Sequence, residues 1–460
     1  MKNWKVCCFV VLVSVFALHP SAAAQQSQEK VLYSFQGGTD GQWPLGKVVF
    51  DAAGNLYGVT QAGGSATCTS YGLCGTVYQL APPAQPGDPW TETVLHVFQG
   101  HTTGDASDPL GGLVMDANGN LYGATGGGGT GNCEILGTFP GCGAVYEVSP
   151  PAEKGGAWTE TVLYSFQGGT DGAFPFGDIV FDNAGNLYGA TQFGGGYGTQ
   201  CGDTFYKYCG TVFEMSPSKV KGGPWTEQVL YSFKGLTGSN PWYGDGANPN
   251  GGLLIDKTGA IYGATQTGGF NCPHSSFDGC GVVYKLEPPA KSGGSWTETV
   301  LQRFSPQMNQ REPNGGLLMD AKGNLYGTTF GGGTMYRLSP NSGTLNSWSE
   351  TILYAFFFDV GGYDPEVPLV VTKNGALCGT TNTGSGKATR GTIFCMKPAT
   401  LGPDNYAFES LYEFQGPPDG EYPAAGLTAN GSNFYGTTQS GGTALVCGFS
   451  GCGTVFAISP

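Results

Sequence analysis

The sequence predicts an all-β fold, a seven-bladed β-propeller with four antiparallel strands in each blade. One unit recurs seven times between residues 29 and 460, which indicates a repeat architecture. Each unit contains four short runs rich in Val, Leu, Ile, Tyr and Phe, and clusters of Gly, Pro, Asn and Asp separate them. The chain also begins and ends inside the unit, so its two ends complete each other.

The unit has four pieces, and each predicts one strand of a blade. From the channel outward, G-G-L-L-x-D predicts strand a, N-L-Y-G-T-T strand b, G-T-V-Y strand c and W-T-E-T-V-L-Y-x-F strand d. Strands a and b are joined by D-A-x-G-N, as at residues 116–120, where Gly supplies the positive φ of a tight hairpin.

The two ends of the chain predict how the ring closes. Residues 29–35 carry the strand-d piece, whereas the last unit ends at residues 453–458 without one. We therefore expect residues 29–35 to form the outer strand of the last blade, which leaves no blade unpaired. The main alternative is a β-solenoid, but this fold is built from shorter and more uniform repeats.

Residues 1–24 have the pattern of a signal peptide. Lys2 and Lys5 precede an apolar run, Val6–Leu18, and Ala22–Ala24 supply a small-residue cleavage site. The apolar run is too short to span a bilayer, and no later segment is long and apolar enough to do so. We expect residues 25–460 to form a single propeller domain that is secreted and monomeric.

The acidic composition narrows the classes of partner. The formal charge is −14, and it falls to about −16 once the leader is removed. The chain contains only four Arg, and nucleic-acid binding depends on basic side chains that neutralise phosphates. Nucleic acid is therefore not an expected partner, whereas neutral glycans, cations and extracellular proteins are.

The cysteines that follow the leader fall in pairs by position. Five pairs lie between strands b and c of one unit, and the sixth lies within those two strands. The pairs are Cys68/Cys74, Cys133/Cys142, Cys201/Cys209, Cys272/Cys280, Cys378/Cys395 and Cys447/Cys452. In an exported chain they predict disulfides, each stabilising by about 2–3 kcal/mol. Zinc is the alternative, but its usual ligand spacing and clustered His are missing.

Strand d opens with an aromatic residue in six units, and a Glu follows closely behind it. The aromatic residues are Trp90, Trp158, Trp225, Trp296, Trp348 and Phe408. The glutamates are Glu92, Glu160, Glu227, Glu298, Glu350 and Glu409. We expect the aromatic residues to pack between blades rather than to bind a ligand, and the glutamates to be solvated.

An Asp four residues before a Pro recurs in the loop from strand d to the next strand a. The copies are Asp40/Pro44, Asp105/Pro109, Asp171/Pro175, Asp245/Pro249, Asp364/Pro368 and Asp419/Pro423, and one unit has Asn309/Pro313. The d–a and b–c loops share one face of a propeller. Six carboxylates are therefore expected around the channel mouth, an arrangement that suits calcium; no other cofactor is expected. The alternative is a turn in which each Asp bonds to its own backbone.

Aromatic residues lie beside several of these Asp residues, and aromatic faces near carboxylates suit sugar rings. They are Trp43, Phe174, Trp242, Tyr243, Tyr363 and Tyr422. The alternative is that they cover neighbouring blades. In the fifth unit the b–c hairpin, residues 330–333, is short and free of Cys, and Arg303 and Arg311 lie nearby. We expect a ligand to enter at this gap in the rim.

Several enzyme classes lack their motifs. No G-x-S-x-G occurs, and residues 384–388 resemble a phosphate-binding loop without its first Gly or the hydroxyl after Lys. The three His beyond the leader are scattered, which leaves little for a metal site or a catalytic base. A hydrolase or lyase with paired carboxylates stays open, because Asp and Glu are plentiful.

Residues 435–442 and 453–456 match the motifs Y-G-T-T-x-x-G-G and G-T-V-F. They resemble the GloVer repeats, a tandem-repeat family of exported bacterial proteins, and the resemblance covers residues 29–460. It implies a secreted or surface protein and no established activity. This chain ends on its last repeat without a C-terminal sorting tail, which favours release over anchoring.

Together these observations predict a secreted, disulfide-linked binding protein without enzymatic activity. The expected ligand is a glycan or a protein on the loop-rich face. One alternative is a carbohydrate-active hydrolase or lyase with paired carboxylates on that face. The other is a structural protein of the cell envelope, which has no concave ligand site.

Overall fold

The computed structural model describes most of the chain from residue 28 onward. The described ranges are 28–64, 74–135, 139–196, 209–220, 222–235, 244–270, 272, 279–291, 293–305, 310–331, 333–343, 346–356, 362–365, 368–384, 390–398, 406–444, 446–448 and 450–459. The predicted leader lies outside them.

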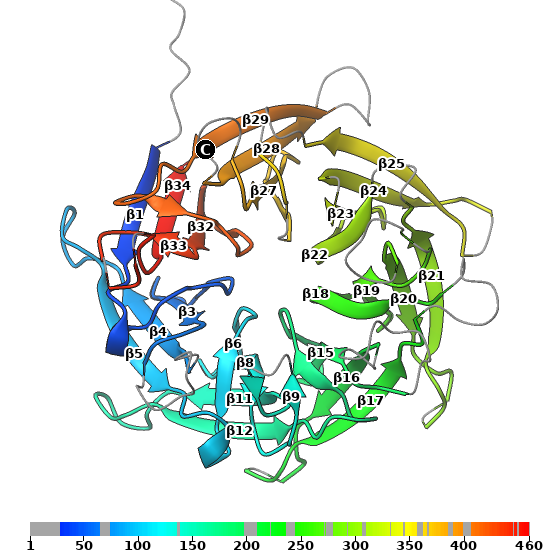
Figure 1. The fold of residues 1–460 in the computed structure, drawn as a ribbon, viewed down its shortest axis with the longest axis horizontal. Coiled ribbons are helices and arrows are strands. Elements are labelled where there is room, and N and C mark those ends of the chain that lie inside the picture. The colour runs from blue at the N-terminus through cyan, green and yellow to red at the C-terminus, as the bar shows by residue number, and fades with distance from the viewer. Residues whose placement is uncertain are drawn as a thin grey trace, which may run out of the picture.

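Seven antiparallel sheets are arranged around a central axis (Figure 1), which confirms the predicted seven-bladed β-propeller. We number the blades in chain order. Blade 1 contains β2 (Val49–Phe50), β3 (Leu56–Thr60), β4 (Thr76–Ala81) and β5 (Thr91–Val97). In blade 2, β6 (Ala106–Pro109) and β7 (Val114–Met115) both pair with β8 (Leu121–Gly128), which is followed by β11 (Ala144–Ser149) and β12 (Thr159–Ser165). In blade 3, β13 (Ala173–Pro175) and β14 (Val180–Phe181) both pair with β15 (Leu187–Phe193), which is followed by β16 (Thr211–Ser216) and β17 (Thr226–Ser232).

The remaining blades repeat the pattern. Blade 4 contains β18 (Ala247–Ile255), β19 (Ile261–Thr267), β20 (Val282–Glu287) and β21 (Thr297–Arg303). Blade 5 contains β22 (Arg311–Met319), β23 (Leu325–Gly331), β24 (Thr334–Pro340) and β25 (Trp348–Ala355). Blade 6 contains β26 (Val370–Val371), β27 (Leu377–Thr381), β28 (Thr392–Pro398) and β29 (Tyr406–Glu413). Blade 7 contains β31 (Thr428–Asn430), β32 (Asn433–Thr438), β34 (Thr454–Ser459) and β1 (Gln28–Ser34).

Smaller elements lie in the loops between these strands. They are two short strand pairs, β9 (Glu134–Ile135) with β10 (Phe139–Pro140) and β30 (Gly420–Glu421) with β33 (Ser440–Gly441), and two single turns of 3-10 helix, η1 (Gly38–Asp40) and η2 (His101–Thr103). No helix in the described ranges is long and apolar enough to cross a membrane.

The ring closes as predicted. Strand β1, from the start of the chain, pairs antiparallel with β34, from its end, and Glu29 lies opposite Ile458. Figure 1 shows the two strands side by side, so the first and last segments complete one blade. Hydrogen bonding between strands that are distant in sequence thus completes the last blade and pairs the outer side of β34.

The recurring Gly of strand b makes room for the recurring aromatic residue of strand c. Gly58 lies directly opposite Tyr78, and a Cβ on Gly58 would stand 2.6 Å from Tyr78 Cζ. The Tyr78 ring is fully buried and contacts Phe35 of blade 7 at a centroid distance of 5.0 Å. The same geometry recurs at Gly263 and Tyr284 in blade 4. The repeat motif is therefore an inter-blade packing motif, because an aromatic ring needs a neighbour without a side chain.

The aromatic residues that open strand d pack across blade boundaries, as predicted. Trp158 of blade 2 contacts Tyr57 of blade 1, and Trp225 of blade 3 contacts Tyr122 of blade 2, each at a centroid distance of 6.0 Å. Both indoles belong to hydrophobic clusters shared by adjacent blades. They contribute to the stability of the ring by burying apolar area.

Disulfides hold the b–c loops. The described bonds are Cys133–Cys142, Cys272–Cys280, Cys378–Cys395 and Cys447–Cys452. Cys74 and Cys209 are also disulfide-bonded, whereas their predicted partners, Cys68 and Cys201, lie outside the described residues. Each loop disulfide that is described in blades 2 and 7 packs against the d–a loop beside it, because a Cβ on Gly37 or Gly168 would meet a cysteine sulfur. The disulfide-linked b–c loops and the d–a loops therefore lie on the same face of the propeller.

Candidate functional site

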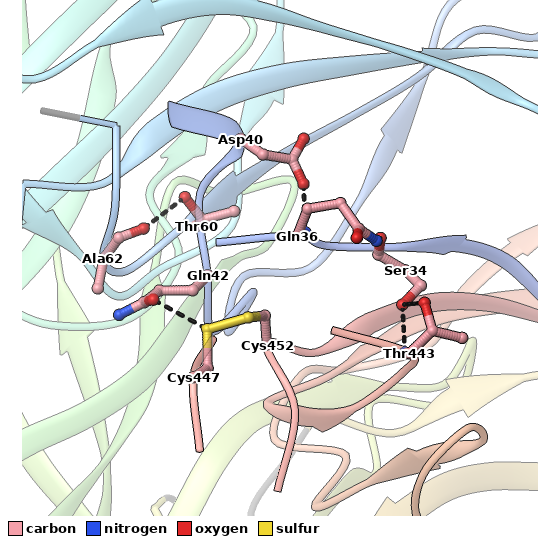
Figure 2. The surroundings of a disulfide bond; sticks show 9 residues. All are labelled: Ser34, Gln36, Asp40, Gln42, Thr60, Ala62, Thr443, Cys447 and Cys452. Carbon is pink, nitrogen blue, oxygen red and sulfur yellow. Dashed lines mark hydrogen bonds between the residues drawn. A yellow bond between two sulfur atoms is a disulfide. The ribbon is translucent and has the colours of Figure 1, made fainter. Parts of the chain in front are cut away.

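The predicted Asp residues hold the ends of the outer strands. Asp40 Oδ1 accepts a hydrogen bond of 2.7 Å from the Tyr33 hydroxyl, and Asp40 Oδ2 accepts one from the Gln36 N–H. Figure 2 shows Asp40 beside Gln36, near the Cys447–Cys452 disulfide of blade 7. Asp171, Asp245 and Asp419 repeat this arrangement with Tyr164, Tyr231 and Tyr412 at 2.6–2.9 Å. Their carboxylates thus face the outermost strands rather than the channel mouth where the spacing predicted them, since a tyrosine hydroxyl and a loop amide supply the donors there.

The glutamates of strand d approach these Asp residues from the next blade. Burial raises the pKa of Glu92 to about 7, and the charge of Asp40 adds to the effect. Burial and the charge of Asp419 raise the pKa of Glu29 to about 8. The prediction that these glutamates are solvated strand charges was wrong for the copies, such as Glu92, that ring closure places against the d–a loop of a neighbouring blade. Glu409 stays 42% exposed and pairs with Lys397.

A group of three side chains is therefore repeated between adjacent outer strands. Its members are a Tyr of one strand d, the Asp of the following loop and the Glu of the next strand d. The described copies are Tyr33–Asp40–Glu92, Tyr164–Asp171–Glu227, Tyr231–Asp245–Glu298 and Tyr412–Asp419–Glu29. We call this arrangement the interface network. Partial burial and the charge of the neighbouring Asp raise the pKa of each of these glutamates to about 7 or 8.

Three interfaces depart from this network. Between blades 5 and 6, Tyr354 stacks on Phe408, which stands one residue before Glu409, at a centroid distance of 4.6 Å. Between blades 4 and 5, Gln302 and Gln310 donate hydrogen bonds of 2.6 and 2.8 Å to Glu350. Between blades 1 and 2, His96 replaces the tyrosine.

A second set of residues surrounds the start of strand a. In every blade, a residue that is not Gly adopts a φ of 54–61° immediately before a Pro. These residues are Trp43, Asp108, Phe174, Asn248, Glu312, Asp364 and Tyr422, and we call them the mouth ring. Asp364 precedes Pro365 and thus corresponds to Trp43, so its predicted alignment with Asp40 was wrong. Such backbone conformations are rare for large side chains and cluster at functional sites.

The mouth ring is fixed by contacts between neighbouring blades. The N–H groups of Trp43 and Phe174 donate hydrogen bonds of 2.9 and 2.8 Å to the carbonyls of Cys452 and Cys142 in the preceding blade. The next proline packs on the Gly that follows that cysteine: a Cβ on Gly75 would stand 2.6 Å from Pro109 Cδ. The C-G-T and D-x-x-x-P motifs therefore form an inter-blade lock.

A cavity of about 250 Å³ lies on the central axis, lined by residues of all seven blades, and the mouth-ring residues are not among its described lining. Residues that directly follow the prolines line it, among them Leu45, Phe176 and Asn250. Lys47 and Asp178 are the charged residues of its described lining, and Asp178 Oδ1 accepts a hydrogen bond of 2.6 Å from the Gly112 N–H. The interface-network Asp residues are not among the described lining residues.

The mouth ring contains three carboxyl groups. Asp108 is 1% exposed, accepts a hydrogen bond of 2.9 Å from Gln61 through Oδ1, and leaves Oδ2 without a described partner. Burial raises its pKa to about 7. Burial also raises the pKa of Asp364 to about 6, and the charge of Glu312 in the adjacent blade adds to this effect. Glu312 Oε1 lies 3.9 Å from Arg311 Nε.

The structure thus separates the predicted site residues into groups. Trp43, Phe174, Asp364 and Tyr422 lie together in the mouth ring, and Arg311 flanks it. Trp242 and Tyr243 lie outside the described residues. Sequence reasoning missed the other three ring members, which are Asp108, Asn248 and Glu312. The signal that marks them is their position directly before the recurring Pro.

A larger concavity, about 700 Å³, lies between blades 6 and 7 on the opposite face. The a–b hairpins of the two blades line it, together with the Lys397–Glu409 ion pair, whose atoms are 2.5 Å apart. It adjoins neither the mouth ring nor the described disulfide loops, with the exception of Cys395.

The repeat motifs and this geometry agree with the result of comparison with known families. The Gloeobacter/Verrucomicrobia repeat model matches residues 14–199 and 137–366. The chain belongs to this family. No curated protein shows significant sequence similarity to this family member.

Solved structures resemble the chain in fold. A virginiamycin B lyase from Staphylococcus aureus is 13% identical, with a TM-score of 0.49 over 94% of this chain and 99% of that one. A chain of a nidogen/laminin complex is 14% identical, with a TM-score of 0.37 over 74% of this chain and 91% of that one. At these values the likeness concerns the fold and carries no functional argument.

Proposed function

We propose that this protein is a secreted, non-enzymatic binding protein that holds a neutral glycan at the mouth ring. The proposal rests on the variety of side chains that occupy the equivalent positions of the mouth ring. One strained backbone position is occupied in seven blades by side chains of unlike chemistry, three aromatic, three acidic and one amide. A purely structural requirement for positive φ would favour Gly or Asn at all seven positions.

The chemistry of the ring suits a sugar. Trp43 and Tyr422 are partly exposed and offer flat apolar faces, whereas Phe174 is buried and packs on Phe176 and Phe193. Carboxyl groups and amides of the ring offer acceptors and donors for hydroxyl groups. Burial raises the pKa of Asp108 and of Asp364, so these carboxyl groups are protonated to a larger extent than exposed ones, and the protonated form can donate as well as accept hydrogen bonds. The acidic chain disfavours anionic ligands, and the inter-blade lock keeps the ring rigid before binding.

The disulfides support the secreted location. Bonds of this kind persist in oxidising compartments, and three of the four described bonds lie in or beside the loops of the mouth-ring face. They also shape an uneven rim, because blade 5 has a short b–c hairpin without cysteine.

Retention on immobilised neutral polysaccharides tests the proposal. We expect the purified mature chain to be retained, and Trp43→Ala or Tyr422→Ala to weaken binding by about tenfold or more. Trp90→Ala removes an indole at the opposite end of a blade and serves as the matched control, with retention unchanged. Equal retention of all variants would refute the role of the ring. No retention would refute the glycan ligand and favour a protein partner.

One observation favours the enzymatic alternative. Glu312 and Asp364 belong to adjacent blades, interact electrostatically and both have raised pKa values, as paired acid and base groups of a glycoside hydrolase do. Release of reducing sugar by the wild type, abolished in both Glu312→Gln and Asp364→Asn, would establish this activity in place of simple binding.

A further inference from the structure

The interface between blades 1 and 2 carries a cluster that the other interfaces lack. His96 lies on β5, Asp105 lies in the loop before β6, and Glu160 lies on β12. One potential ligand atom from each residue lies within 4.8 Å of the other two. It is the one such group of three in the described part of the chain. All three side chains are partly buried.

The repeat shows what is unusual about this cluster. At the equivalent interfaces a Tyr hydroxyl donates a hydrogen bond to the Asp, for example Tyr164 to Asp171 at 2.7 Å. His96 occupies that tyrosine position, but its Nε2 lies 3.6 Å from Asp105 Oδ2, too far for a hydrogen bond. This interface therefore has an imidazole in place of the tyrosine hydrogen bond, and the contacts of His96 with Asp105 and Glu160 are electrostatic.

The ligand atoms are poorly satisfied by the protein. His96 Nε2 and Glu160 Oε1 are buried and make no hydrogen bond in the described structure; the Glu oxygen is also unpaired at equivalent interfaces, so the imidazole nitrogen is the atom peculiar to this one. Buried polar atoms of this kind normally have a partner, and an ion is one that would satisfy both. The separation of 3.6 Å also matches ligands on one ion, since zinc bonds of about 2.0–2.2 Å place tetrahedral ligands about 3.3 Å apart.

The surroundings fix the ligands in place. Asp105 Oδ2 and Oδ1 accept hydrogen bonds of 2.6 and 2.7 Å from the N–H groups of Gln99 and Ala106, which orient the carboxylate and leave lone pairs free. The His96 ring packs edge-on against Phe98 at a centroid distance of 4.9 Å. Supporting contacts of this type set the orientation of metal ligands.

We propose that His96, Asp105 and Glu160 bind a divalent transition metal ion, zinc in the first place. One imidazole nitrogen and two carboxylates form a donor set that zinc accepts, whereas calcium prefers oxygen ligands alone. The ion would join the outer strands of blades 1 and 2, β5 and β12, in place of the tyrosine hydrogen bond. Three protein ligands leave a coordination position for water. The site is independent of the mouth ring and of its proposed ligand.

Metal titration of the chelator-treated mature chain tests the proposal. We expect one zinc ion to bind per chain, to raise the midpoint of thermal unfolding, and Co²⁺ to give the visible absorption bands of a tetrahedral site. His96→Tyr restores the residue of four equivalent interfaces, so it should fold and lose the ion. Glu160→Gln should also lose it.

Matched controls separate this site from general metal binding. Glu227→Gln changes the equivalent Glu of the next interface, and His101→Asn changes a neighbouring histidine. Both should keep one ion and the Co²⁺ spectrum. Equal binding by the wild type and His96→Tyr would overturn the assignment, as would the absence of bound zinc at millimolar concentration.

Discussion

The buried glutamates of the interface network make stability depend on pH, and Glu92 gives the clearest case. Burial and the charge of Asp40 raise its pKa from 4.5 to about 7. The folded state therefore holds the proton more tightly than the unfolded state does. This contribution to stability is complete below pH 4.5 and is lost as the pH rises through about 7.

The magnitude follows from the shift. A shift of this size corresponds to about 3 kcal/mol if it is fully transmitted, and solvent screening of the half-buried side chain reduces it to about 1–2 kcal/mol. Glu92→Gln has no carboxyl group to ionise, so it avoids the burial of a negative charge that the wild type incurs as the pH rises. We therefore expect it to gain about 1–2 kcal/mol relative to the wild type between pH 5 and pH 8.

Urea or thermal unfolding at pH 5, 6, 7 and 8 measures this difference. The wild type itself should lose stability over the range, because Glu29, Glu227 and Glu298 share the raised pKa. Glu153→Gln is the control, since its side chain is exposed and should show no such trend. A constant difference between Glu92→Gln and wild type at all four pH values would refute the reasoning.

Three further outcomes follow from the packing. Gly263→Ala should destabilise by about 1–3 kcal/mol, because its Cβ would stand 2.6 Å from Tyr284 Cζ, whereas Gly196→Ala, in open space, should be neutral in chemical denaturation. The double variant Cys378→Ser/Cys395→Ser should lose about 2–3 kcal/mol of unfolding free energy. Reducing agent should lower the unfolding midpoint of the wild type toward that of the variant and should affect the variant less. Deleting residues 25–35 removes β1 and exposes β34, so the shortened chain should aggregate in size-exclusion chromatography; a monodisperse, folded product would contradict the closure.

The fold was predictable because the repeat encodes it locally. Hydrophobic runs, turn residues and the spare strand-d piece at residues 29–35 sufficed to predict blade number and closure. Cysteine pairs close in sequence sufficed to predict the described disulfides. Packing of Trp158 and Trp225 between blades followed from the apolar character of a strand start.

The candidate sites were predictable only in part. The motif spacing brought attention to Trp43, Phe174 and Tyr422, which the structure places in one ring. It misaligned Asp364, because two prolines follow that residue and the spacing selects the wrong one. It also assigned the Asp residues to the channel mouth, since a spacing cannot show whether a carboxylate turns toward the axis or back to its own outer strand.

The sequence by itself determined which positions are equivalent: seven copies of four strands, the closing strand and the paired cysteines. Only the tertiary structure decided which side chains of neighbouring copies meet. Glu92 is a partly buried acid, and His96 lies close to Glu160, 64 positions away. Both results arise because the outer strand of each blade packs against the d–a loop that connects it to the preceding blade. A period states what repeats along the chain, but the contacts between repeats depend on the tilt and stagger of the blades, which emerge only when the ring is closed.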